Sequence, residues 1–469
     1  MHRVLPLLAA TLLPSSAHAA AFYFTDSGTR AIGRGSAVVA SVDDLSALYH
    51  NPAGLVRLRQ AQTFISLSGV DQYVEFDRMD EPDDDLDFAP IYNTGPFMLV
   101  PAFGLSGSLG VPRTTFAIGF ISPQAPDVQY VSDGAQRYSL IDQLLWEFAG
   151  VAGAGVQVTD WLALGATFQA RVLRADMELA ITTLEGDDPQ NDIDIRFSVA
   201  DWFAPNFSVG TLVEPTPWMT VGASFQPATT YHAVGSISAD FEGHAFSEGG
   251  FLDGTHFVDE EVTSTLRMPA IARAGIDLHP TDKWDIELAG SWEGWHVWDE
   301  IVITDIDLVV EMAPDSWIDE DAVVTNDIVI PSNYLDVWSV RLGGDYQVHE
   351  RVTVRAGGYY ETSAIPKAFQ GVTLVDGDKI GAGLGAGFHV GRIDVDAAFG
   401  QTWFLPRDIT DSEVRQLVLD LNLSDPASSE VVDGKIVGNG HFSSRLTFLS
   451  MAMTWRFGKA PTTPVTTDS

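Results

Sequence analysis

Two dense runs of carboxylates are the first feature of the chain that could do chemistry. Residues 71–87 contain nine acids and one base, Arg78, and residues 299–327 contain ten acids without Lys or Arg. Paired carboxylates serve as acid and base in glycoside hydrolysis, or bind a metal, when burial tunes them. Neither run has the spacing of a calcium loop, and runs of like charge are usually solvated. We therefore expect acidic surface loops and no metal site.

The motifs of other enzyme classes are missing from the sequence. The His residues are scattered, without a His-Glu-x-x-His or a Gly-x-Ser-x-Gly pattern. The chain has no Cys, which excludes a thiolate nucleophile, a thiolate metal site and a disulfide scaffold. We expect no catalytic residue and no cofactor, with a lipid hydrolase kept as the enzyme alternative.

Composition narrows the class of protein further. The chain has 469 residues, a formal net charge of −38 and 45% apolar residues. This acidity argues against nucleic acid as a partner, because a nucleic-acid-binding surface must be basic. The apolar share argues against long disorder.

The first nineteen residues read as a secretory signal. Met1-His2-Arg3 is basic, residues 4–13 are apolar, and Ala17-His18-Ala19 fits the small-x-small cleavage rule. The alternative, a buried N-terminal helix, is less favoured because Pro14 and two serines break the segment. No later stretch is apolar for 18 residues, which excludes helical membrane spans.

Alternation of apolar and polar residues dominates the rest of the chain. In residues 380–391 the even positions are apolar, and the odd positions are glycine except for His389. A period of two indicates strands with one apolar face. Many such segments run for 10 to 20 residues, longer than the strands of a soluble sandwich, and short turns alternate with long acidic loops. This pattern predicts an all-β protein, a 14-stranded antiparallel transmembrane β-barrel.

We predict fourteen strands, an even number that places both termini on one side of the membrane. Their expected ranges are 62–71, 97–110, 114–124, 138–158, 161–180, 194–213, 218–241, 262–279, 283–304, 334–348, 351–363, 378–391, 392–408 and 441–457.

Residues 20–60 break the alternation. Asp43 and Asp44 stand at the start of a short helical pattern, and Asn51-Pro52 stops it because proline disfavours a helical residue before it. A compact segment before the first strand of a large barrel suggests a plug, or hatch, in the lumen; a periplasmic tail is the alternative. The expected organisation is a signal at 1–19, a hatch at 20–60, a barrel at 61–458 and a tail at 459–469.

Two motifs flank the predicted helix, Gly-Arg-Gly-Ser-Ala at residues 33–37 and Tyr-His-Asn-Pro-Ala-Gly-Leu at residues 49–55. With these motifs the sequence resembles a known family, the FadL-type outer-membrane transporters of long-chain fatty acids and aromatic hydrocarbons, whose best marker is Asn51-Pro52-Ala53. Later segments, such as Trp292-Glu293-Gly294-Trp295, fit as well. The twelve residues after Phe457 depart from the family, whose barrel ends near a terminal aromatic. The short acidic loop at 181–193 departs from the family's amphipathic capture helices.

The resemblance implies a hatch motif at Asn51, Pro52 and Ala53 and a passive route for hydrophobic molecules. Substrate would leave sideways through the barrel wall beside a kinked third strand. Gly119, Pro123 and Pro126 are the candidates for the kink, because proline removes a donor from a strand ladder; alternatively Pro123 simply begins the loop. We predict that the Asn51 segment satisfies the unpaired backbone, since an amide both donates and accepts.

The resemblance also implies a lumenal pocket with a few cations for a polar head group. The alternation of the strands points a set of arginines into the lumen, of which Arg171 stands most alone: Arg171, Arg267, Arg273, Arg341 and Arg355. Arg341 and Arg355 face acids and fit a structural ion-pair network better. We expect Phe22, Tyr23 and Phe24, at the mature N-terminus, to form either a mobile apolar latch or ordinary packing contacts. The glycines at 381–387 leave room for substrate or for the hatch.

The sequence as a whole predicts an outer-membrane channel of a Gram-negative bacterium for passive uptake of fatty acids or similar hydrophobic compounds. Expected partners are that small molecule, outer-membrane lipid and lipopolysaccharide, and the barrel assembly machinery; we expect a monomer. A structural or adhesive barrel and a general porin are the non-enzyme alternatives, and the hatch argues against the porin.

Overall fold

The computed structural model describes residues 28–58, 60–80, 88–124, 127–183, 186–240, 256–258, 261–304, 308–311, 322–324, 327–420, 422 and 428–457. The predicted signal at 1–19, the tail at 459–469, the Phe22–Phe24 segment and Pro126 lie outside the described residues. Among the described residues, no helix is long and apolar enough to cross a membrane.

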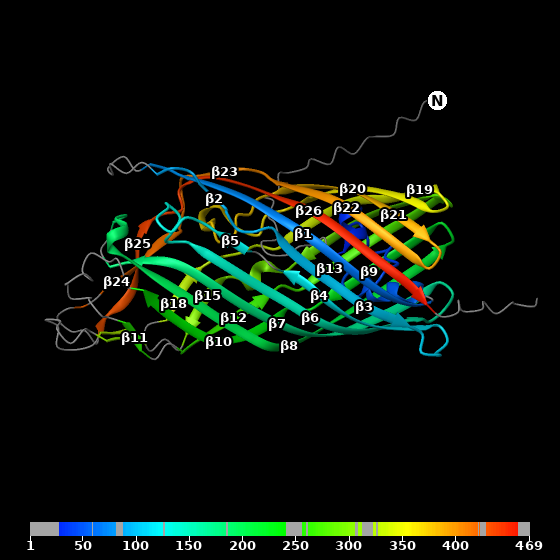
Figure 1. Ribbon diagram of the computed structural model, residues 1–469, viewed down its shortest axis with the longest axis horizontal. Helices are drawn as coiled ribbons and strands as arrows, with labels where there is room; N and C mark the ends of the chain where they lie inside the picture. Colours follow the sequence, from blue (N-terminus) through cyan, green and yellow to red (C-terminus); the bar gives the residue numbers. More distant parts are fainter. Residues whose placement is uncertain are drawn as a thin grey trace, which may run out of the picture.

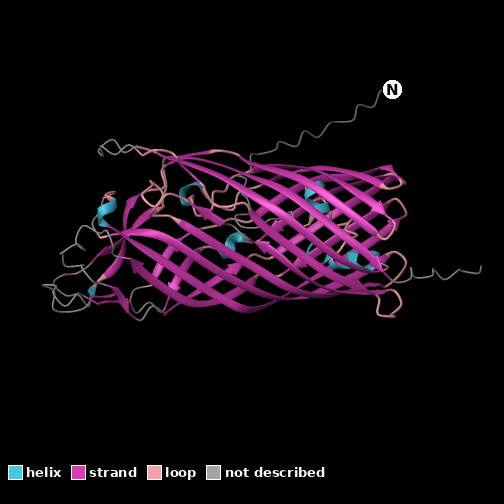
Figure 2. Cartoon of the chain, viewed as in Figure 1, coloured by secondary structure: helices cyan, strands magenta, loops and turns pink. Residues whose placement is uncertain are grey.

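The strands form one closed antiparallel barrel (Figures 1 and 2). β1 (Ala61–Arg78) pairs along its whole length with β26 (Gly440–Phe457), and its other edge pairs with β3 (Met98–Gly107). The first and last strands therefore close the sheet, which confirms the predicted 14-stranded barrel.

Eight of the fourteen wall strands run as single segments: β1, β3, β6 (Asp142–Gln157), β7 (Leu162–Thr182), β8 (Asp192–Thr216), β20 (Val352–Glu361), β21 (Lys379–Val390) and β26. Six are built from two consecutive segments: β4 (Thr114–Gln124) and β5 (Asp127–Gln129), β9 (Met219–Gln226) and β10 (Thr229–Asp240), β12 (Glu261–Met268) and β13 (Ile271–Thr281), β14 (Trp284–Glu293) and β15 (Glu300–Thr304), β18 (Ile328–Pro331) and β19 (Val337–His349), β22 (Ile393–Phe404) and β23 (Arg407–Ile409).

The remaining strands lie at the end of the barrel that carries the long loops. These are β2 (Ile91–Tyr92), which extends the edge beside β1, a separate sheet of β11 (His256–Val258), β16 (Leu308–Glu311) and β17 (Ala322–Val324), and a hairpin of β24 (Arg415–Asp420) and β25 (Glu430–Ile436). Short 3-10 turns lie at η2 (Pro189–Asn191), η3 (Trp295–Val297) and η4 (Lys367–Phe369).

The predicted strand ranges need correction mainly at the long-loop end. The first strand continues to Arg78 rather than ending at residue 71, because residues 71–78 pair with β26. The expected loop at 409–440 contains the β24–β25 hairpin. Acidic side chains mark solvent exposure and not the end of a strand, since a ladder can continue above the membrane.

The outer face of the wall is apolar. On β1, Ile65 and Leu67 are exposed whereas Ser66 and Ser68 are buried, and the same alternation runs along β3 and β21. In water such a surface would aggregate, whereas the hydrocarbon of a bilayer requires it. The inward positions can be small or polar because the lumen is filled by the chain itself.

Residues 28–58, hereafter the plug, fill the short-turn half of the lumen. They contain α1 (Thr29–Gly33), α2 (Ala47–His50) and η1 (Pro52–Arg57), which Figure 2 shows inside the barrel. Short helices alternate with turns here, so the plug is held by contacts with the wall more than by its own hydrogen bonds.

Glycines of the wall let the plug approach the strands closely. A Cβ at Gly357 or Gly343 would overlap the carbonyl of Arg34, and one at Gly383 would overlap the carbonyl of Ile32. Similar contacts line much of the lumen: Gly155 and Gly165 meet Pro52, Gly210 meets Asn51, and Gly222 meets Val39 and Ala40. Within the Gly381–Gly387 row, Gly383 and Gly385 make room for the plug, whereas Gly381 faces Tyr359 and Gly387 faces Arg355 and Asp396 of the wall.

The glycine contacts predict that Gly357→Ala lowers the stability of the folded protein. The new methyl group meets backbone of the plug and not a movable side chain tip, and overpacking of this kind costs about 1–3 kcal/mol. Urea unfolding of the detergent-folded protein, read from its heat-modifiable gel mobility, measures the change. Gly371→Ala is the control, because no atom lies within 4 Å of its Cβ position. Equal midpoints for both variants would contradict plug packing at Gly357.

Candidate functional site

Two arginines of the plug are buried against carboxylates of the wall. Arg34 is fully buried, and its Nη2 lies 2.8 Å from Asp285 Oδ1 while its Nη1 lies 2.9 Å from Asp345 Oδ1. Arg30 Nη2 lies 3.0 Å from Asp345 Oδ2, and its Nη1 donates to the Ser41 carbonyl at 2.9 Å. Burial disfavours the charge of Arg30, but the surrounding carboxylates outweigh burial and hold its pKa well above the usual value.

A third carboxylate of the wall binds the plug backbone. Glu287 on β14 is fully buried and accepts hydrogen bonds from the backbone N–H groups of Val39, Ala40 and Ser41 at 2.7 to 2.9 Å. Charge-assisted bonds of this type are the strong ones in proteins. Together with the arginines they tie the plug to β14 and β19.

The Asn51-Pro52-Ala53 motif ties the plug to a different part of the wall. Asn51 Nδ2 donates to the carbonyls of Val39 at 2.8 Å and Thr211 at 3.1 Å, and its Oδ1 accepts from Ala53 N at 3.1 Å. Thr211 lies on β8. The prediction that this segment satisfies strand 114–124 is therefore wrong, because the direction in which the plug folds places the motif against β7 and β8.

The strand ladder is broken between β3 and β4. Pairing runs from Gly107–Phe116 to Phe103–Phe120 and then ends, so residues 98–102 of β3 have no partner on β4. On its other side β4 has a register shift between Ile121 and Gln124 where it pairs with β6. The two wall strands separate after about 17 Å of paired length from their turn.

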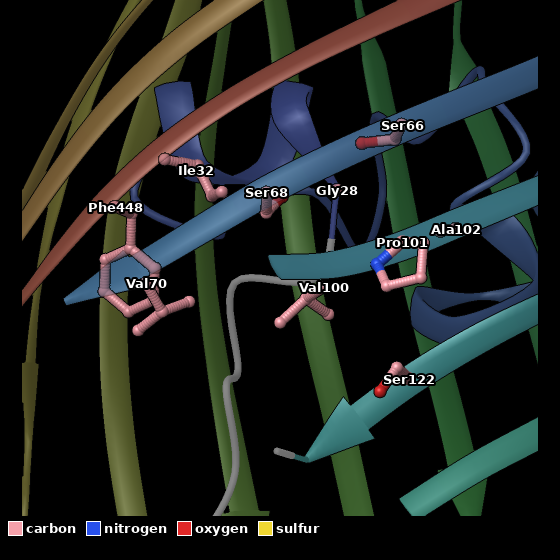
Figure 3. A pocket seen from close by; sticks show the side chains of 10 residues that line it. All are labelled: Gly28, Ile32, Ser66, Ser68, Val70, Val100, Pro101, Ala102, Ser122 and Phe448. Atoms are coloured by element: carbon pink, nitrogen blue, oxygen red, sulfur yellow. The ribbon is translucent and has the colours of Figure 1, made fainter. Parts of the chain in front are cut away.

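An opening lies at this break (Figure 3). It is lined by Val100 and Ala102 on one edge, Ser122 on the other, and Gly28 and Ile32 of the plug behind. The outward neighbours Leu99 and Phe103 are exposed, so the opening falls within the apolar outer surface.

Prolines stand on both edges of the break. Pro123 lies in β4 beyond the last pair with β3, and Pro101 lies in β3 opposite Leu67 of β1. Pro101 was not among the predicted kink residues, although proline removes a ladder donor there as it does at Pro123. Gly119 is paired with Gly104 and Val151, and the Cβ position of Gly119 lies 2.9 Å from Leu48 of the plug. Gly119 thus lies before the break and permits a close plug contact.

The prediction that Arg171 stands apart from acids is wrong. Its Nη1 lies 2.6 Å from Glu147 Oε1, and both side chains are fully buried. Its Nε and Nη2 donate to Gln169 Oε1, and the Tyr231 hydroxyl donates to the same Glu147 oxygen at 2.7 Å. Glu147 is on the neighbouring strand, and this proximity follows from the β6–β7 register, which the sequence does not display.

The other marked arginines divide into three cases. Arg341 pairs with Glu361, and Arg355 pairs with Asp345 and Asp396, as expected of a structural network. Arg267 is exposed, because the buried positions are even-numbered in β12 and odd-numbered in β13. The alternation therefore does not continue across the break between the two strands. Arg273 lies 4.7 Å from the Tyr49 ring in a small cavity and, within the described part of the chain, forms no ion pair.

Residues 10–441 match the family model described as "Outer membrane protein transport protein (OMPP1/FadL/TodX)". The chain belongs to this family. A Neisseria meningitidis protein, NMB0088, is 20% identical over 96% of this chain and 97% of its own length. The crystal structure of a Pseudomonas aeruginosa FadL homologue has a TM-score of 0.73 at 17% identity, covering 94% of this chain and 100% of that one.

A second solved structure agrees on the fold. The toluene transporter TbuX of Ralstonia pickettii has a TM-score of 0.60 at 16% identity, covering 92% of this chain and 98% of that one. At such identities the structures support the barrel fold alone. Family membership makes this chain an outer-membrane transport protein and not an enzyme, which removes the lipid hydrolase alternative.

The buried ion pairs predict a strong effect of Arg34→Met. This change leaves Asp285 and Asp345 short of a cation, and breaking a buried pair costs about 3–5 kcal/mol. We expect a lower unfolding midpoint and, because the plug is released from β14 and β19, a higher conductance in planar bilayers.

Arg113→Met is the matched control for Arg34→Met. Arg113 pairs with Asp160 at 2.8 Å, but both side chains are exposed, and pairs of that kind add little stability. Plug anchoring by Arg34 would be contradicted if the two variants had the same conductance and the same unfolding midpoint.

Proposed function

We propose that the protein takes up hydrophobic molecules, such as long-chain fatty acids or hydrocarbons, passively across the outer membrane and releases them sideways between β3 and β4. The observation that carries this proposal is the end of the β3–β4 ladder at Phe103–Phe120, within the apolar outer surface. A structural or adhesive barrel would have no use for a break in its wall. A general porin needs an open lumen, which the plug occupies.

The physical advantage of a side exit is that the substrate stays in apolar surroundings. Val100, Val70 and Phe448 give the opening an apolar lining, and exposed Leu99 stands at its outer edge. A fatty acyl chain gains about 0.8 kcal/mol for each CH₂ kept out of water. Release through the periplasmic end would lose that energy and would require the plug to leave.

Uptake from outside requires movement of a segment at the long-loop end. Residues 362–378, between β20 and β21, cross the lumen, and Ala364, Ile365 and Val372 are buried there. Tyr130 donates to the Val372 carbonyl at 3.1 Å, and Arg407 donates to the Ile365 carbonyl at 2.7 Å. Further hydrogen bonds to Leu335 and Glu413, and apolar packing of the segment, also hold it across the substrate's path.

Arg273 is the better candidate for binding a polar head group than Arg171. Arg171 is engaged by Glu147 and Gln169, whereas Arg273 faces the cavity beside Tyr49, His50 and Glu293. A cation there could bind a fatty carboxylate. We further propose that the protein acts as a monomer, surrounded by outer-membrane lipid and lipopolysaccharide, after insertion by the barrel assembly machinery.

A cross-link across the opening tests the side exit. Ala102→Cys with Ser122→Cys places one thiol on each edge in this Cys-free chain. Joining them with a short thiol-specific cross-linker containing a disulfide should reduce uptake of labelled oleate and toluene to the background of cells without the protein. Reductant should restore it.

The control pair for this cross-link lies in the closed part of the same two strands. Ser106 and Ala117 are direct partners in the ladder, so Ser106→Cys with Ala117→Cys should cross-link without loss of uptake. Continued uptake with the opening closed would mean that substrate leaves through the lumen.

A further inference from the structure

We propose that Asp277, His279 and Asp285 bind one first-row divalent cation of the Zn²⁺ class at the short-turn end of the lumen. The three side chains come from the two strands of the β13–β14 hairpin. Their ligand atoms all lie within 4.8 Å of one another. In an outer-membrane barrel the short turns face the periplasm, so the ion would come from that side.

The hairpin register explains why the three residues meet. Asp277 and His279 are two apart on β13 and share its inward face, and Leu278 pairs with Ile286 on β14. The turn that follows brings Asp285 opposite them. His279 Nε2 lies 3.2 Å from Asp277 Oδ2 and 3.7 Å from Asp285 Oδ2.

Within the described residues, the Asp277 carboxylate lies close to the two other proposed ligands, His279 at 3.2 Å and Asp285. It is fully buried, and neither of its oxygens accepts a hydrogen bond from any residue the structure describes. The neighbouring acids are satisfied, since Glu287 accepts three backbone N–H bonds and Asp285 Oδ1 pairs with Arg34. A buried carboxylate that no hydrogen bond satisfies is costly, and a cation bound between the three side chains would balance its charge.

The ligand types select the class of ion. One imidazole nitrogen and two carboxylate oxygens suit Zn²⁺ and its first-row neighbours, whereas Ca²⁺ and Mg²⁺ take oxygen ligands only. In a tetrahedral site with bonds of about 2.0 Å the ligand atoms stand about 3.3 Å apart. The distances from His279 bracket that value. The His279 side chain is 37% exposed, which leaves room for the ion to reach the site and for water as a fourth ligand.

The site touches the anchor of the plug. Asp285 also holds Arg34 through its other oxygen, and Arg30 Nη2 lies 4.0 Å from Asp285 Oδ2. A divalent ion on Oδ2 would therefore share Asp285 with the plug arginines. No linear metal motif marks this site in the sequence; its signal is an Asp-x-His on one strand face followed by a turn and an Asp.

Metal binding by the purified mature protein tests the proposal independently of uptake. The protein in detergent is first treated with EDTA and then titrated with Zn²⁺ against a chromophoric chelator, and with Co²⁺ by visible absorption. We expect one equivalent of tightly bound ion and d–d bands typical of a four-coordinate site. Asp277→Asn and His279→Gln should each weaken binding at least about tenfold, with heat-modifiable mobility confirming a folded barrel.

His389→Gln is the matched control. His389 is also 37% exposed and lies 2.9 Å from Asp394, at the short turn between β21 and β22, but Arg456 already pairs with that carboxylate. This variant should bind like the wild type. The proposal is overturned if the wild type binds no stoichiometric ion, if folded His279→Gln binds unchanged, or if His389→Gln loses as much affinity. The exposed ring of His279 keeps the test decisive even if Asp277→Asn fails to fold.

Discussion

In hydrocarbon, a backbone N–H or C=O without a partner costs several kcal/mol, and this constraint shapes the whole wall. It explains why the first and last strands pair over their full length, Ala61 with Phe457 through Arg78 with Gly440. The same cost applies where the pairing between β3 and β4 ends. Pro101 and Pro123 stand on the two edges there, and proline has no N–H to leave unpaired. The break is thus built from residues that reduce its cost.

The plug and the wall depend on each other through two kinds of contact. Wall glycines bring the strands against plug backbone, so shape alone restricts where the plug can lie. Buried carboxylates on β14 and β19 then bind its arginines and N–H groups. Within one short segment, Gly28 and Ile32 line the opening while Arg30 and Arg34 hold the opposite wall. Because one short segment contacts both, we expect a substitution at Arg30 or Arg34 to shift the residues of α1 that line the opening.

The charged residues of the long loops and those of the lumen have different surroundings. Much of the net charge of −38 comes from acids in and beside the segments that the sequence predicts as long loops. Even there one base has a structural use, because Arg78 binds Asp187 with two bonds of 2.9 and 3.0 Å and joins β1 to the loop after β7. Inside the lumen, acids occur beside arginines or plug N–H groups. Asp277 is the acid for which a cation from outside gives the simplest account.

The sequence by itself determined the barrel, because a period of two over 10 to 20 residues has no other stable solution in a membrane. It placed strand 114–124 at its observed limits and set the plug before the first strand. Only the tertiary structure decided which residues meet across strands. Glu147 beside Arg171, Asn51 against Thr211, and Asp277 with His279 and Asp285 all follow from register and from the path of the plug. Alternation reports the face on which a side chain lies, whereas its partner depends on a neighbouring strand that can be hundreds of residues away.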